Sequence, residues 1–296
     1  MNLEMILTFL TITETGNISS ASEKLYISQA TASQRLKKLE EELGGAELIE
    51  RHRGYKNATL TEKGRAFVPI AEKMLGLLQE SRRLEHICAR PFLQIGSTDS
   101  LAVYMLGDFF SRLIRNTPDT DYTLMIKDSV DIFRLVNIRA LDVGIVLDSI
   151  KDDNIRTEKL AEEKMVLVTR DPAFKDRDVI RTVELDRSRL IYQYWNKKYQ
   201  AWFDTQFDST IRNRISVNTI SLLRSAMSEE KAFAIVPCSI AKYLHQDGFS
   251  MKELAPAPPN REIFFITKKD LAPGQAELIQ DFYQRLRSFM NEQTLT

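Results

Sequence analysis

Two short helical stretches separated by a tight turn lie near the start of the chain, and they restrict its first domain more than any other feature. Ser20-Ala21-Ser22-Glu23 has the form of a capping box and predicts a helix over 20–25. Ser28 is a favourable N-cap and predicts the next helix over 29–42. The buried face of that helix would comprise Ala32, Leu36, Leu39 and Leu43. Two short helices joined by a turn of a few residues form a helix-turn-helix.

The flanking segments complete a winged helix-turn-helix. Apolar residues at helical spacing predict a first helix over 2–15, which Gly16-Asn17 ends. Behind the helix-turn-helix, residues 47–51, 52–58 and 59–61 have the pattern of a strand, an exposed turn and a second strand. We therefore expect residues 1–60 to form an all-α domain with a β-wing.

The start of the second helix of such a motif is the part that reaches the edges of DNA bases. Glutamine pairs with adenine, serine and threonine pair with several bases, and lysine and arginine neutralise phosphates. Net charge is zero, but the basic residues here are segregated from the acidic ones. The base-contact candidates are Ser28, Gln29, Thr31, Ser33 and Gln34, and the phosphate-contact candidates are Arg35, Lys37, Lys38, Arg51, Arg53 and Lys56. For each residue singly the alternative is an ordinary exposed polar side chain, and for Ser28 it is capping.

A long apolar seam follows the wing. Thr61 is placed to cap a helix that reaches about Ala89, and we assign residues 61–90 to a linker helix. Its apolar positions, at alternating steps of three and four, are Phe67, Ile70, Ala71, Met74, Leu77, Leu78 and Leu84. This spacing is typical of a coiled coil and predicts a dimer through the helix. Packing of the seam against the chain's own first helix is the alternative.

Strands and helices alternate after Arg90-Pro91, which is the pattern of a parallel α/β sheet. The predicted strands are Phe92–Gly96, Tyr122–Lys127, Val143–Leu147, Lys164–Thr169, Leu190–Tyr194, Ile215–Asn218, Phe233–Val236 and Glu262–Thr267. The predicted helices cover 100–116, 129–139, 197–207, 219–229, 238–246 and 274–291. Residues 91–296 are therefore expected to form an α/β domain.

Composition excludes several other classes. A chain with 43% hydrophobic and 28% charged residues is an ordinary globular protein, and no apolar run reaches the length of a membrane span. The start of the chain lacks the pattern of a signal peptide, and two distant cysteines indicate neither a disulfide framework nor a metal site, so we expect a cytoplasmic protein without a metal. With three histidines and no nucleophile or phosphate-loop motif, an enzyme is disfavoured and no cofactor is expected.

A resemblance sharpens this interpretation. Residues 16–44, from Gly16-Asn17-Ile18-Ser19 to Glu42-Leu43-Gly44, strongly resemble the DNA-binding domain of the LysR-type transcriptional regulators. Leu48-Ile49-Glu50-Arg51 and Leu60-Thr61-Glu62-Lys63-Gly64 extend the likeness. Weaker similarity continues at Leu93–Ser97, Leu141–Val146 and Ala234–Pro237, so that it spans nearly the whole chain.

The resemblance implies a periplasmic-binding-protein-like effector domain with two Rossmann-like lobes and a two-strand hinge. Lobe I would be 91–161 plus 266–296 and lobe II 162–265, with crossings near Ala161–Lys164 and Phe265–Lys268. It also implies a homotetramer that binds double-stranded operator DNA and a small-molecule effector, with RNA polymerase as a further partner. A binding protein that has lost its gene-regulatory role is the alternative function.

Polar residues at predicted strand ends are the effector-binding candidates. Ser97-Thr98-Asp99-Ser100 follows a strand and opens a helix, where free N–H groups and hydroxyls hold anions, although the charge of Asp99 would oppose one. The full set is Ser97, Thr98, Ser100 and Ser129 from lobe I and Asn196, Asn218 and Thr219 from lobe II. Helix capping is the alternative for Thr98, Ser100 and Ser129. Because these groups are mostly uncharged donors, we expect a polar or anionic metabolite.

Overall fold

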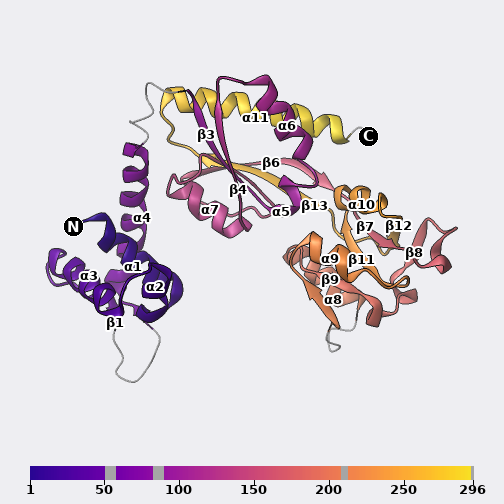
Figure 1. The fold of residues 1–296 in the computed structure, drawn as a ribbon, viewed down its shortest axis with the longest axis horizontal. Helices are drawn as coiled ribbons and strands as arrows, with labels where there is room; N and C mark the ends of the chain where they lie inside the picture. The colour runs from indigo at the N-terminus through magenta and orange to yellow at the C-terminus, as the bar shows by residue number, and fades with distance from the viewer. Residues whose placement is uncertain (51–57, 83–89, 208–212, 295–296) are drawn as a thin grey trace. The chain divides into compact units, whose positions relative to one another are not determined.

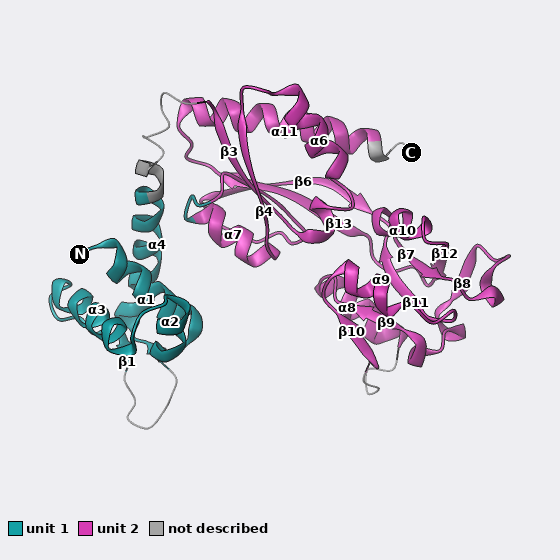
Figure 2. Cartoon of the chain, in the orientation of Figure 1, with its two compact units in different colours: residues 1–89, 138–140 teal, residues 90–137, 141–296 magenta. Residues whose placement is uncertain are grey.

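The computed structural model describes residues 1–50, 58–82, 90–207 and 213–294. The chain divides into two compact units, one of residues 1–89 with 138–140 and one of residues 90–137 with 141–296 (Figure 2).

The first unit is a small helical domain with a two-stranded wing base. Its elements are α1 (Leu3–Thr15), α2 (Ile18–Lys24), α3 (Gln29–Glu42), β1 (Ile49–Glu50), β2 (Thr59–Leu60) and α4 (Glu62–Arg82). The strands pair antiparallel, and Phe9, Leu36, Leu39 and Phe67 share one apolar core. The predicted winged helix-turn-helix is thus present, with residues 51–57 of the wing outside the described residues.

The caps of these helices agree with two of three predictions. Thr31 N donates to Ser28 Oγ at 3.1 Å, and Gly64 N donates to Thr61 Oγ1 at 2.9 Å. The predicted capping box at Ser20 is wrong, because α2 begins earlier and Asn17 accepts the Ser20 N–H. Gly16 ends α1 at φ 71°, and this left-handed residue turns the chain so that Asn17 can cap.

The apolar seam of α4 serves two purposes. Phe67 and Ala71 are buried in the core of the first unit, and Met74 packs against that core. Ile70 and Leu77 are each 53% exposed. Packing within the first unit, the alternative expected from the sequence, therefore accounts for Phe67, Ala71 and Met74. Ile70 and Leu77 form a separate, exposed apolar face of α4. Leu84 lies outside the described residues.

The second unit contains a five-stranded lobe, lobe I, of which β3, β4, β6 and β13 are labelled in Figure 1. Its strand order is β4-β3-β5-β13-β6. Its strands are β3 (Phe92–Ser97), β4 (Asp121–Ile126), β5 (Val143–Val146), β6 (Ile155–Glu163) and β13 (Arg261–Lys268). Its helices are α5 (Asp99–Ala102), α6 (Gly107–Asn116), α7 (Ser129–Asn137) and α11 (Pro273–Thr294). Ile145 and Phe265 belong to the core under α6 and α11, whereas their neighbours Val146 and Ile266 belong to the core under α7, so the helices cover both faces of the sheet.

Lobe II is built on the order β11-β7-β12-β8, with a parallel β10-β9 pair joined to β11 by a bridge between Leu190 and Phe233. Its strands are β7 (Met165–Thr169), β8 (Val179–Arg181), β9 (Ile191–Gln193), β10 (Ile215–Val217), β11 (Phe233–Pro237) and β12 (Ser250–Ala255). Its helices are α8 (Lys197–Gln206), α9 (Ile220–Ala226) and α10 (Cys238–His245). The sheets are mixed rather than wholly parallel, because β7 runs antiparallel to β11 and β12, and β13 runs antiparallel to β5 and β6.

Two predicted boundaries need correction. β13 pairs with β6 from Arg261 onward, so residues 261–265 belong to the sheet of lobe I, and the crossing expected near Phe265–Lys268 comes before Arg261. The single helix expected over 100–116 is broken into α5 and α6, since the chain turns between them to bury both Leu101 and Leu106.

Close packing of α7 on the sheet predicts a large effect at Gly144. A Cβ there would lie 2.5 Å from Ile132 Cγ2 and 2.7 Å from Ile266 Cγ1. We expect Gly144→Ala to lower the free energy of unfolding by about 1–3 kcal/mol through overpacking. Gly274→Ala is the control, because its Cβ meets nothing within 4 Å. Equal urea midpoints for the two variants would contradict this packing.

Candidate nucleic-acid interface and effector site

The start of α3 presents polar side chains that are not engaged by the domain itself. Gln29 and Gln34 are exposed, Ser33 is half-buried, and none of them has a hydrogen-bond partner in the described part of the chain. Ser28 and Thr31 are committed to the cap, with their hydroxyl oxygens 2.8 Å apart. Three of the five base-contact candidates are therefore free to meet another molecule.

The basic phosphate-contact candidates differ in how far they are already paired with carboxylates of the chain. Arg35 reaches back to α1, where its guanidinium donates to Glu4 at 2.6 Å. Lys37 lies 3.7 Å from Glu41 on the next turn, an exposed pair of little energetic weight. Lys38 is exposed on the same helix. The wing candidates Arg51, Arg53 and Lys56 lie outside the described residues.

Tyr26 is a candidate that the sequence analysis missed. It is 96% exposed and sits at φ 55° in the turn between α2 and α3. A phenol hydroxyl donates well to phosphate oxygens, and the turn places this one beside the start of α3. A tyrosine in the short turn directly before the α3 N-cap Ser28 was the signal in the sequence.

The lobe I candidates gather at the carboxyl ends of β3 and β4. Ser97, Thr98, Ser100 and Ser129 are all buried. Thr98 begins α5 without a side-chain capping bond, and its Oγ1 is buried without a partner among the described residues. Ser129 Oγ accepts the Leu147 N–H at 3.1 Å. Thr98 is therefore the member of this group with unused hydrogen-bonding capacity.

The lobe II candidates are mostly occupied. Asn196 caps α8 by accepting the Tyr199 N–H at 2.8 Å, and Thr219 caps α9 by accepting the Leu222 N–H at 3.3 Å. Asn218 is exposed. Capping therefore accounts for Asn196 and Thr219, and the structure gives no separate evidence that they bind a ligand.

A buried ion pair at the hinge was also missed. Arg261, 1% exposed, donates through Nε and Nη2 to Glu163 Oε2 and through Nη1 to Ser100 Oγ at 2.9 Å. Burial lowers the pKa of the Arg261 guanidinium, and the charge of Glu163 opposes that shift. The Trp195 ring centroid lies 5.8 Å from the guanidinium carbon, and Trp195 Nε1 donates to Ile235 O. Ser100 is therefore engaged by the chain itself.

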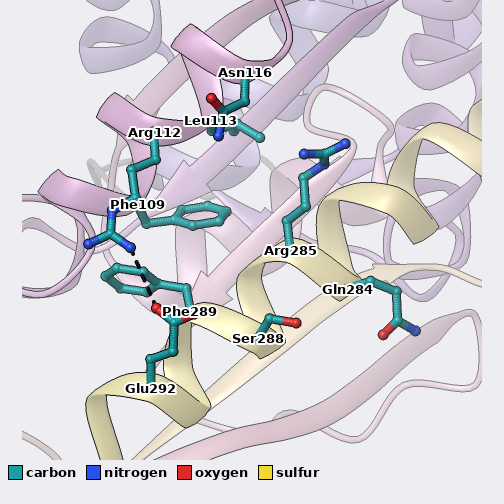
Figure 3. Close-up of a pocket in the computed structure, with 9 residues that line it drawn as sticks. All are labelled: Phe109, Arg112, Leu113, Asn116, Gln284, Arg285, Ser288, Phe289 and Glu292. Carbon is teal, nitrogen blue, oxygen red and sulfur yellow. Dashed lines mark hydrogen bonds and ion pairs between the residues drawn. The ribbon is translucent and has the colours of Figure 1, made fainter. Parts of the chain in front are cut away.

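A pocket of about 340 Å³ lies elsewhere, between α6 and α11 (Figure 3). The Arg112 guanidinium lies 5.7 Å from the Phe289 ring centroid and 3.5 Å from a Glu292 carboxylate oxygen. Arg285 also lines it and is paired with Asp281. The predicted effector-binding residues do not line this pocket.

No helix in the described ranges has the length and apolar character needed to cross a membrane. Within the same ranges, no cluster of three or more histidine, cysteine, aspartate and glutamate side chains is arranged to hold a metal ion.

Comparison with known families resolves the identity of both units. Residues 3–65 match the bacterial regulatory helix-turn-helix protein model of the lysR family, and residues 90–291 match the LysR substrate binding domain. The chain belongs to the LysR family. The resemblance seen in the sequence and the predicted fold class are thereby confirmed.

Among the curated relatives of this LysR-family chain is the HTH-type transcriptional regulator HdfR of Escherichia fergusonii, 30% identical over 178 residues. HdfR of Escherichia coli O17:K52:H18 is 29% identical over 177 residues. Both alignments cover 58% of this chain and 62% of the relative, so the match spans less than two thirds of the relatives' length.

Solved structures show the same fold over the full length. A full-length OxyR variant from Pseudomonas aeruginosa matches with a TM-score of 0.61 and 18% identity, covering 98% of this chain and 94% of the other. CbnR, a LysR family transcriptional regulator, matches with a TM-score of 0.59 and 18% identity, covering 98% and 99%.

Proposed function

We propose that this chain is a sequence-specific DNA-binding transcription regulator whose activity responds to a small molecule bound between the lobes of its second unit. The observation that carries the proposal is the start of α3, where the side chains of Gln29, Ser33 and Gln34 have no hydrogen-bond partner among the described residues. These residues lie in the segment that matches the regulatory helix-turn-helix of the family. A structure of CbnR, similar in fold with a TM-score of 0.53, contains that protein's target DNA.

The division of labour on DNA follows from the chemistry of the side chains. Gln29, Ser33 and Gln34 read base edges in the major groove. Lys37, Lys38 and Tyr26 contact phosphates and supply affinity without sequence preference. The wing cations Arg51, Arg53 and Lys56 act in the same way on the flanking backbone. DNA binding of this kind weakens steeply as salt rises.

Self-association is part of the proposal. Ile70 and Leu77 are seven residues apart and half-exposed, which is the spacing of a coiled-coil seam. A second copy of α4 would cover this face, and a pair of DNA-binding domains would then match two half-sites. We propose a dimer through α4 within a tetramer, acting on DNA in the cytoplasm, in contact with RNA polymerase and without catalytic activity.

Thr98 is the proposed centre of effector recognition. Its buried hydroxyl, which has no partner in the part of the chain that the structure describes, lies at the carboxyl end of β3, where α/β sheets commonly bind ligands. Ser97, Ser100 and Ser129 surround the same strand ends, and Asn196, Asn218 and Thr219 are proposed to contribute from lobe II. A ligand that contacts both lobes shifts their equilibrium by its differential affinity for the two arrangements.

Base reading by α3 is tested with Gln29→Ala. We expect this variant to lose discrimination at one base position, by about 1–3 kcal/mol, when bound sequences are selected from a random library. Lys38→Ala should instead weaken binding to all sequences and lower the salt slope by about 1. Gln284→Ala, an exposed glutamine on α11, is the control. An unchanged preference in both Gln29→Ala and Ser33→Ala would refute the assignment.

A further inference from the structure

The environment of Glu163 is that of a bound anion. Glu163 is the last residue of β6 and is 7% exposed. One carboxylate oxygen accepts two N–H groups of the Arg261 guanidinium, and the other accepts the Ser239 N–H. A guanidinium fork and a backbone amide at a helix start are the groups with which proteins bind carboxylates.

The two sets of donors come from different parts of the second unit. Ser239 is the second residue of α10, so its N–H has no partner within that helix and belongs to the positive end of the helix dipole. Arg261 begins β13 and bonds to Ser100 of α5 with its remaining nitrogen. Hydrogen bonds thus run from lobe I through Arg261 and Glu163 to α10 of lobe II, as they would through a ligand that touched both lobes.

The charges of Arg261 and Glu163 determine which kind of ligand can bind beside them. Arg261 and Glu163 neutralise each other, so the positive charge of the guanidinium is already paired with a carboxylate of the chain. A second anion buried beside this pair would lose its hydration, and it would not gain the charge of Arg261, which Glu163 already neutralises. Conversely, Thr98 Oγ1 and Ser239 Oγ are buried hydroxyls without partners among the described residues, and they suit uncharged polar groups.

We propose that Glu163 is a built-in ligand that fills a carboxylate site made by Arg261 and the start of α10, so that the effector bound at the hinge is an uncharged polar molecule. The statement about the effector rests on the proposed function. The carboxylate site does not, because it follows from contacts within the chain. The sequence predicts an effector that is either polar or anionic, and this proposal restricts it to uncharged polar molecules.

Removal of the internal carboxylate should create a site for an external one. In Glu163→Ala, Nε and Nη2 of the Arg261 guanidinium and the Ser239 N–H would lose their buried acceptor, beside the space that the carboxylate had occupied. We expect sodium acetate or formate to raise the melting temperature of this variant by about 3 °C more than sodium chloride at equal ionic strength. Calorimetry should show acetate binding to Glu163→Ala and none to the wild-type chain.

Two further variants define the site. Glu162→Ala removes the neighbouring, exposed carboxylate of β6, which pairs with Lys159 at the surface, and it should show no specific acetate effect. Arg261→Met combined with Glu163→Ala should lose the acetate response. If Glu163→Ala folds poorly in chloride, the yield of folded protein after refolding in acetate and in chloride gives the same comparison.

Three results would overturn the proposal. Equal acetate stabilisation of the wild-type chain would show that an open anion site exists without removal of Glu163. Absence of acetate binding or rescue in Glu163→Ala would show that the donors do not form a carboxylate site. Retention of the response in the double variant would exclude Arg261 from it. All three are measured without DNA, so a failure here is distinct from a failure of the regulator assignment, which the library selection measures.

Discussion

Arg261→Met is expected to lower the free energy of unfolding of the second unit by about 3–5 kcal/mol, because it leaves the Glu163 carboxylate buried without its cation. The loss of the bond to Ser100 adds to this cost. The double variant Arg261→Met/Glu163→Leu should recover most of the loss, since apolar side chains of similar size commonly replace a buried ion pair at little cost. The measurement is urea unfolding of the wild-type chain, the two single variants Arg261→Met and Glu163→Leu, and the double variant.

The control for this cycle is Arg112→Met, whose pairing with Glu292 is exposed and should contribute less than about 1 kcal/mol. The coupling free energy between Arg261 and Glu163 then follows from the four proteins of the cycle. Additive effects of the two single substitutions would show that the side chains do not interact, and the hinge pairing would have to be abandoned.

Leu77→Glu is expected to dissociate the assembly and to weaken operator binding at least about tenfold. The substitution puts a charge on the apolar face of α4, where a second copy would bury it without a partner. Loss of the dimer also removes the simultaneous binding of two half-sites. Light scattering gives the mass of the assembly, and titration of labelled operator DNA gives the affinity.

Two further variants of α4 distinguish loss of the interface from loss of stability. Arg65→Glu reverses a charge at an exposed position about 120° around the same helix from Leu77 and should preserve the assembly. Met74→Glu should instead destabilise the first unit, because Met74 packs against its core. A wild-type mass for Leu77→Glu would rule out the α4 interface, and wild-type stability for Met74→Glu would contradict the division of the seam.

Local patterns made the first unit predictable. Ser28 and Thr61 cap the helices expected of them because an N-cap interaction spans only three residues. The same rule failed at Ser20, since Asn17 competes for the same helix start and follows a glycine that can turn the chain. The sequence could not show which apolar residues of α4 pack within the first unit and which remain for a second copy, because both contacts require the same apolar periodicity.

Contacts between distant segments explain what was missed in the second unit. The sequence of β6 is rich in charged residues because β6 is an edge strand and most of its residues are half-buried or exposed. Arg261 and Glu163 are 98 residues apart, and their meeting depends on the register of two strands. Asn196 and Thr219 were chosen for their place after strands, where capping and ligand binding favour the same residue types.

Trp195 lies where its intrinsic fluorescence can report changes at the hinge. The chain has two tryptophans, Trp195 and Trp202, so Trp202→Phe would leave a single emitting indole. That indole is bonded to the backbone of β11 and faces the guanidinium that connects the lobes. Any rearrangement that moves the guanidinium away changes the electric field across the ring and hence its emission wavelength. Hinge motion in this protein is therefore open to fluorescence without an added dye.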